Sequence, residues 1–426
     1  MTTVPRTPPA PLPLADAAAA PSPRAVAAGS RDPWWDNTRF VAATLIVVLH
    51  TVGSLLPRID ALHAFQLGAW AFRVPAFVLL AGVFSSAEPL GDRRLRSLVR
   101  SVALPGLLFG LLFSLESWAL GAEFRLHVAQ LPWNLWFLMS LFFWRLLLPL
   151  VAQLRFPLAT TTVVALGVGY LPEFGMQFSA SRTLVYLPLF LLGWRIGQGG
   201  LASWFTRRRT LPVAVAGIAA SVAVGLLWHR DVEGRWLSMR HAYSPDDPMG
   251  LEWAWLIRLT VLVCGAALVL CLLRVMPRRR LPLISSMGAG GFTVYLLHPL
   301  VILPFREKGV IARVDRPLEV AGLVACAVLL AMVLGSTPVR RLARPLTRPP
   351  VGLLLRPENA AKAGPADGAA DGAADGPRRA GAGRNGARQG GAGRNGARQD
   401  GARQNSARQG GAGQDGAGQD GAGLRG

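Results

Sequence analysis

The segment Asp36-Asn37-Thr38-Arg39-Phe40-Val41-Ala42-Ala43-Thr44-Leu45-Ile46-Val47-Val48-Leu49-His50-Thr51 decides the fold of this chain. Between Arg39 and His50 every residue except Thr44 is apolar, which predicts the start of a membrane-spanning helix. At about 100° per residue, their separation is almost three helical turns, so both lie on one face, roughly 16 Å apart. Ionisable residues inside a hydrophobic span usually face the bundle interior or a water-filled path. The segment therefore predicts a polar path with a cation at its entrance and an imidazole at depth.

The composition indicates a polytopic membrane protein. Of the 426 residues, 51% are hydrophobic, and apolar runs of span length recur along the chain. We therefore expect an all-α fold, a polytopic transmembrane helical bundle of about ten spans. The expected spans are 39–57, 66–86, 98–120, 132–152, 157–172, 183–199, 211–229, 252–275, 283–304 and 318–338.

The net charge of +21 comes almost wholly from arginine, because Lys308 and Lys362 are the only lysines. Such a basic balance is typical of nucleic-acid-binding proteins, but here the arginines lie in short loops between spans and in the tail, so membrane topology explains them better. The acid-free clusters at 93–96, 207–209 and 278–280 predict cytoplasmic loops. We expect a multi-pass protein of the cell membrane with both termini cytoplasmic, in contact with lipid and with no nucleic acid.

The sequence predicts neither disulfide bonds nor a metal site. Cys264, Cys271 and Cys326 all fall within apolar spans, which predicts buried thiols rather than disulfides. No metal-ligand spacing occurs in the sequence, and no metal is expected.

The chain divides into a membrane domain and two tails. Residues 1–33 are rich in Pro and Ala and predict a disordered cytoplasmic tail, the membrane domain covers 34–345, and 346–426 is a disordered Gly/Ala/Arg/Gln tail whose decamer 381–390 is nearly repeated directly afterwards. Asp36 and Asn37 are the expected N-cap residues of the first span. Two outer segments, 229–251 and 305–317, either contact an extracytoplasmic acceptor or are simply solvated loops.

Two more charged residues are expected inside the membrane. Arg73 lies in the second span just before Pro75, which kinks or opens a helix. It is either a site residue or an arginine that snorkels or pairs with an acid. Glu116, near the outer end of the third span, either partners Arg73, tunes a histidine or reaches the interface. Both are candidate additional site residues.

A second histidine also lies in an apolar run. His298 follows Tyr295 by one turn on the same helix face, and Pro299 is expected to disturb the hydrogen-bond ladder and free a carbonyl. Structural and functional roles are both open for Tyr295 and His298. Asn134, where the fourth span opens, is a weaker candidate as a hydrogen-bond donor to an oxyanion.

Taken in order, these residues resemble a known family. The Arg39-x10-His50 pair resembles the signature of the membrane-bound acyltransferase-3 family, and the residues around Arg39 look most like its fucose-4-O-acetylase-like branch. Further similar segments follow in the family's order: Val74-Pro75-Ala76-Phe77-Val78-Leu79-Leu80-Ala81-Gly82-Val83-Phe84, Trp136-Phe137-Leu138, Leu187-Pro188-Leu189-Phe190-Leu191-Leu192-Gly193 and Tyr295-Leu296-Leu297-His298. The resemblance covers about 31–345, everything except the tails.

The resemblance implies O-acyl transfer, usually of acetyl, from cytoplasmic acyl-CoA (acetyl-CoA) to a hydroxyl. The acceptor is typically a sugar of a cell-envelope polysaccharide or a glycolipid, or a secreted metabolite. Arg39, with Arg93 and Arg96 of a basic loop similar to the family's, would hold the donor phosphates. His50 would be the general base or would itself be acylated, and the sequence does not separate these routes.

A transporter or flippase of a glycan or lipid, with no acyl-transfer chemistry, is the competing class. Ten spans, buried ionisable residues and broken helices would suit it equally well. Transfer of label from acetyl-CoA would distinguish the enzyme from the transporter.

Overall fold

The computed structural model describes residues 32–126, 129, 131, 133–172 and 177–350, and the expected terminal tails lie outside these ranges except for residues 32, 33 and 346–350. Every regular element in the described ranges is a helix. The α-helices are α1 (Pro33–Val52), α2 (Asp60–Gly68), α3 (Val74–Val83), α4 (Asp92–Leu98), α5 (Leu104–Ala119), α6 (Trp136–Val151), α7 (Pro157–Gly167), α8 (Ala180–Gly197), α9 (Ala202–Thr206), α10 (Thr210–Trp228), α11 (Gly234–Ser238), α12 (Gly250–Val275), α13 (Pro282–Gly288), α14 (Gly291–Glu307), α15 (Pro317–Gly335), α16 (Thr337–Leu342) and α17 (Arg344–Thr347). Short 3₁₀ turns occur at Gly53–Leu55, Trp70–Phe72, Trp133–Leu135, Val168–Tyr170, Gln177–Ser179 and Ile311–Arg313, and a π turn at Val99–Ala103 joins α4 to α5.

Several helices are long and apolar enough to cross a membrane. In the described ranges these are α1, α4 with α5, α10, α12 and α15, five in number, or up to seven if the bent pairs α2–α3 and α13–α14 each count as one span. Helices α6 and α7 are apolar but shorter. Each of the expected spans overlaps a helix. The all-helical membrane fold is therefore confirmed, while the count of about ten spans stays a prediction.

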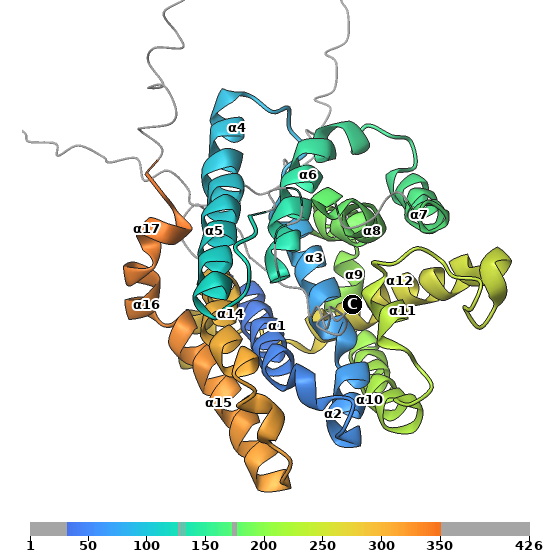
Figure 1. Ribbon diagram of the computed structural model, residues 1–426. Helices are drawn as coiled ribbons and strands as arrows, with labels where there is room; N and C mark the ends of the chain where they lie inside the picture. Colours follow the sequence, from blue (N-terminus) through green and yellow to red (C-terminus); the bar gives the residue numbers. More distant parts are fainter. Residues whose placement is uncertain (1–31, 127–128, 130, 132, 173–176, 351–426) are drawn as a thin grey trace, which may run out of the picture.

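Helix α1 lies in the middle of the bundle, packed against α3, α13, α14 and α15 (Figure 1). It begins at Pro33, and the carboxylate of Asp32 accepts a hydrogen bond from the backbone N–H of Trp34 at 3.0 Å. The prediction that Asp36 and Asn37 cap this helix is therefore wrong. Proline at the first helical position already has a helical φ, and Asp32 directly before it is a good cap.

The break expected in the second span is confirmed. Helix α2 ends at Gly68, and the following segment Trp70–Val83, which contains α3 from Val74 onward, is bent by 59° from it. Pro75 has no N–H and lies in the first turn of α3, where it separates this helix from the 3₁₀ turn before it. The break leaves the buried side chain of Arg73 at the junction between the two helices.

Small residues set the distance between the helices in two packed pairs. A Cβ added to Gly82 of α3 would overlap the carbonyl of Phe190, and one added to Gly193 of α8 would overlap the carbonyl of Leu79. A Cβ on Gly288 of α13 would likewise overlap the backbone of α1 at Asp36. Close backbone approach through glycine is typical of helix packing in membranes. It fixes α3 against α8, and α13 against the start of α1.

The three cysteines are free thiols, as expected. Cys271 is buried, but Cys264 of α12 and Cys326 of α15 are exposed. Burial was wrongly predicted for these two because an apolar span does not reveal which of its faces points out of the bundle.

Candidate functional site

Two histidines from distant parts of the chain meet in the interior. His50 lies near the end of α1, and His298 lies in the middle of α14. Nδ1 of His50 is 3.1 Å from Nε2 of His298, and the ring centroids are 5.0 Å apart. His298 is fully buried and His50 is 8% exposed. The structure thus brings together two candidates that the sequence treated separately.

The second nitrogen of His298 sets the direction of this hydrogen bond. Nδ1 of His298 is 2.8 Å from the carbonyl oxygen of Val294, and a carbonyl can only accept, so Nδ1 carries the hydrogen. In the neutral ring Nε2 of His298 then accepts from Nδ1–H of His50. Burial favours neutral rings, because a charged group without a partner is costly away from water. The contacts therefore orient His50 with its lone pair on Nε2.

Pro299 of α14 leaves a backbone carbonyl available for a contact that holds this helix in place. Pro299 cannot donate to the carbonyl of Tyr295, as the sequence predicted, and Nδ2 of Asn134 donates to that oxygen at 2.7 Å. The hydroxyl of Tyr295 donates to the carbonyl of Asn134 at 2.9 Å in return. This reciprocal contact ties α14 to the turn before α6. It gives Asn134 a bracing role, and the oxyanion contact considered from the sequence stays a prediction.

At the other end of the helix the guanidinium of Arg39 is held by an acid and a ring. Nη1 of Arg39 donates to Oδ1 of Asp36 at 2.7 Å, and the guanidinium lies 4.2 Å from the ring centre of Phe84. Arg39 and Asp36 are both buried. Because α1 is one continuous helix, the expected spacing of almost three turns between Arg39 and His50 is preserved.

Three consecutive arginines are held beside the start of α1. Nδ2 of Asn37 donates to the carbonyls of Pro277 and Arg279, at 2.9 and 3.1 Å. The guanidinium of Arg278 stacks 4.5 Å from the ring centre of Trp34. These contacts fix the loop that contains the cluster 278–280 on the same end of α1 as Arg39.

The remaining predicted residues lie on or beside other helices. Arg93 and Arg96 lie on α4, the first exposed and the second half-buried. Arg73 is buried and lines a small cavity beside α11. Glu116 is half-buried on α5, and its Oε2 has no hydrogen-bond partner among the described residues, so the pairing with Arg73 or a histidine considered from the sequence is not seen.

Sequence reasoning missed Asp36 and the cluster 278–280 as parts of the entrance. The pairing of Asp36 with Arg39 could have been predicted, because an acid and a base three residues apart lie on one helix face. The cluster was assigned to topology alone. Only the contacts that Asn37 and Trp34 make across the fold reveal where it lies.

The site therefore combines an oriented basic nitrogen at depth with a fixed cation at the entrance of the same helix. The comparisons agree with this chemistry. Residues 32–336, well over half of the chain, match the family model described as an acyltransferase domain, and this range includes Arg39, His50 and His298. No curated protein and no solved structure matches the chain. The chain thus belongs to the acyltransferase-3 family, as an acyl-transferring enzyme of the membrane.

Proposed function

We propose that this enzyme moves an acyl group, acetyl above all, from cytoplasmic acyl-CoA to a hydroxyl of a cell-envelope sugar, a glycolipid or a secreted metabolite. The observation that supports this most is the hydrogen-bonded series from the carbonyl of Val294 through His298 to His50. It presents a basic nitrogen inside the membrane domain. A transporter or flippase has no need of a base oriented in this way, so we do not favour that class.

In the direct route, Nε2 of His50 takes the proton of the acceptor hydroxyl while that oxygen attacks the thioester carbonyl carbon. The carbon–sulfur bond breaks, and the proton then passes from the imidazolium to the leaving thiolate, which restores neutral His50. His298 accepts from His50 throughout, and this bond strengthens as positive charge develops on His50, so His298 is a positioning residue. In the acyl-enzyme route, the same lone pair on Nε2 attacks the thioester carbonyl carbon, the carbon–sulfur bond breaks and the thiolate leaves. The acceptor hydroxyl then takes the acyl group from Nε2, and its proton passes to the thiolate.

The donor phosphates would bind at the entrance of α1. Arg39 is fixed there by Asp36, and charge-assisted hydrogen bonds from guanidinium groups suit phosphate oxygens. The resemblance adds Arg93 and Arg96 to this donor site. The cluster 278–280 supplies further positive charge close by.

The same proposal includes a topology. The chain crosses the cell membrane about ten times with both termini cytoplasmic, which places the arginine clusters of the short loops on the cytoplasmic side. Acyl-CoA then meets the start of α1, and His50 lies toward the acceptor. The similarity of residues 31–40 favours the fucose-4-O-acetylase-like branch of the family.

The test uses membranes from cells with and without the chain, incubated with acetyl-CoA labelled in the acetyl group. We expect label in the envelope glycan or lipid fraction only when the chain is present, and we expect mild alkali to release it, as it does from an O-ester. Equal label in both membrane preparations would reject the enzyme in favour of the transporter.

A further inference from the structure

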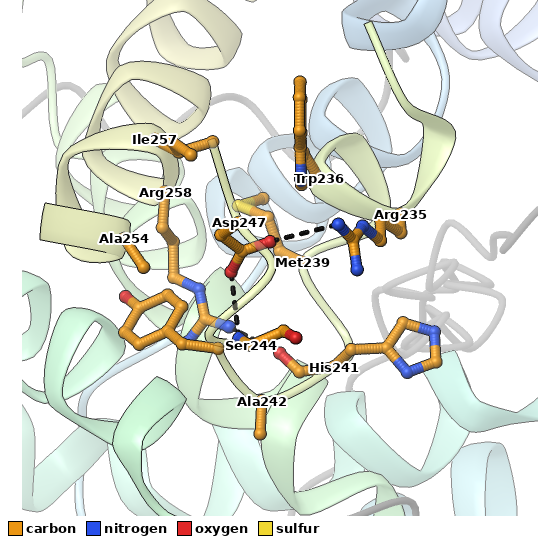
Figure 2. A pocket seen from close by; sticks show the side chains of 11 residues that line it. Arg235, Trp236, Met239, His241, Ala242, Ser244, Asp247, Ala254, Ile257 and Arg258 are labelled. Atoms are coloured by element: carbon orange, nitrogen blue, oxygen red, sulfur yellow. Dashed lines mark hydrogen bonds and ion pairs between the residues drawn. The ribbon is translucent and has the colours of Figure 1, made fainter. Parts of the chain in front are cut away.

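Two cavities lie on either side of α11. The larger, about 380 Å³, is lined by the segment 235–247 and by α12, and Figure 2 shows its side chains. The smaller, about 60 Å³, is lined by residues of α2, α6 and α8 and of the junction before α3. Arg235 and Trp236 face the larger cavity, whereas Leu237 and Ser238 face the smaller one, so α11 forms a wall of both.

The charges of the larger cavity are satisfied within the chain. Oδ1 of Asp247 forms an ion pair with Nη2 of Arg235 at 3.4 Å, and a dashed line marks this pair in Figure 2. Arg258 donates to the carbonyl of His241 at 2.7 Å and stacks 4.4 Å from the ring centre of Tyr243. A pocket of this kind is polar without a strong excess of charge.

The smaller cavity differs in its charge. Arg73 and Arg182 both line it, and none of the described residues that line it is acidic. Within the described ranges Arg182 has no carboxylate partner. Its guanidinium lies 4.6 Å from the ring centre of Trp136 and is repelled by Arg240. Positive charges around one small space repel each other, and an anion bound between them offsets that repulsion.

The size of the smaller cavity limits what can bind. A water takes up about 30 Å³ in the liquid, so a space of about 60 Å³ holds about two waters or one phosphate or carboxylate group, and not a sugar ring. The planar guanidinium of arginine binds either oxyanion through paired hydrogen bonds. The rings of Trp70 and Trp136 line the same space and offer apolar surface to the part of the ligand next to its charge.

The smaller cavity is connected to α14 through packed aromatic residues. Trp136 lines it, and the adjacent Phe137 packs against Tyr295 with ring centroids 6.1 Å apart. Tyr295 precedes His298 by one helical turn. Packed aromatic side chains therefore link the lining of the smaller cavity to the helix that carries His298.

We propose that this smaller cavity binds the anionic group of the acyl acceptor, a phosphate ester or a carboxylate carried by the sugar that receives the acyl group. The proposal rests on the acyl-transfer function above. It adds that the acceptor is anionic, and that Arg73 and Arg182 select it by charge while His50 acts on its hydroxyl.

The test measures binding by the full-length protein in lipid nanodiscs at low ionic strength. The probes are glucose 1-phosphate, glucuronate and neutral methyl glucoside, titrated by calorimetry. At least one anionic probe should bind about tenfold or more tightly than the neutral one, and Arg182→Gln should abolish that difference. Arg182→Lys keeps the positive charge and should retain part of this difference in affinity. Arg230→Gln, an exposed arginine paired with Asp60, is the matched control and should bind as the wild type does.

The proposal is overturned if both anionic probes bind no more tightly than methyl glucoside, or if Arg182→Gln binds them as tightly as the wild type does. It is also overturned if Arg230→Gln loses as much affinity for the anionic probes as Arg182→Gln does. A preference for one anionic probe supports the proposal and tells phosphate from carboxylate. Binding requires no acyl transfer and is measured without acyl-CoA. A failure of the acyltransferase function would therefore leave the binding result intact, and the two failures are distinguishable.

Discussion

The hydrogen bond between His50 and His298 leads to a quantitative prediction. Replacing His298 with leucine keeps an apolar side chain of moderate volume but removes the acceptor of the Nδ1–H of His50. A hydrogen bond to a charged group is worth about 1.5–3 kcal/mol and one between neutral groups about 0.5–1.5 kcal/mol, so the transition state loses about 1–1.5 kcal/mol more than the ground state. At 1.36 kcal/mol per tenfold change in rate, we expect kcat to fall about 5- to 13-fold. The KM for acetyl-CoA should not change, because the proposed site of the donor phosphates is near Arg39, almost three helical turns away.

His298→Gln is the matched variant, because its amide oxygen can again accept from His50 and should restore most of the rate. The assay is the initial rate of label transfer from acetyl-CoA in membranes that contain equal amounts of each variant, with thermal unfolding in detergent as the control for folding. A leucine variant that works at the wild-type rate would refute the positioning role. So would leucine and glutamine variants that are equally slow while equally stable.

Two further predictions concern the entrance and the packing. Arg39→Ala should raise the KM for acetyl-CoA about tenfold with little effect on kcat, because it removes a charge-assisted contact to the donor, and steady-state kinetics with an unchanged KM would remove Arg39 from the donor site. Gly193→Leu should abolish folded protein, because its side chain would overlap the carbonyl of Leu79, whereas Gly322→Leu, with nothing near its Cβ, should fold normally. Size-exclusion chromatography of detergent extracts measures this, and equal yields of the two variants would contradict it.

The helices were predictable where the sequence contains a long apolar run or a proline. The run between Arg39 and His50 predicted α1, and Pro75 predicted the break between α2 and α3. The start of α1 was misplaced because two capping signals compete there, and Pro33 decides in favour of Asp32. The close contact of α3 with α8 was not predictable, because a single glycine such as Gly193 does not reveal which backbone it meets.

The candidate site was predictable residue by residue but not as an assembly. His50 and His298 were each recognised as costly residues in an apolar run, yet nothing local in the sequence indicates that residues so far apart share a hydrogen bond. The relation between Pro299 and the carbonyl of Tyr295 was predictable, because proline acts on its own helix. The cavity beside Arg182 was not predictable, because it forms only where several helices and α11 meet.

The most direct test of the role of His50 is acetyl transfer by the purified chain in nanodiscs. The acceptor is an envelope extract from cells that lack the protein, and wild type is compared with His50→Ala. The lone pair on Nε2 of His50 is central to both proposed routes, so we predict that the variant loses at least about 100-fold in rate while its yield and thermal stability equal those of the wild type. A stable His50→Ala protein that transfers acetyl at nearly the wild-type rate would contradict the proposed mechanism.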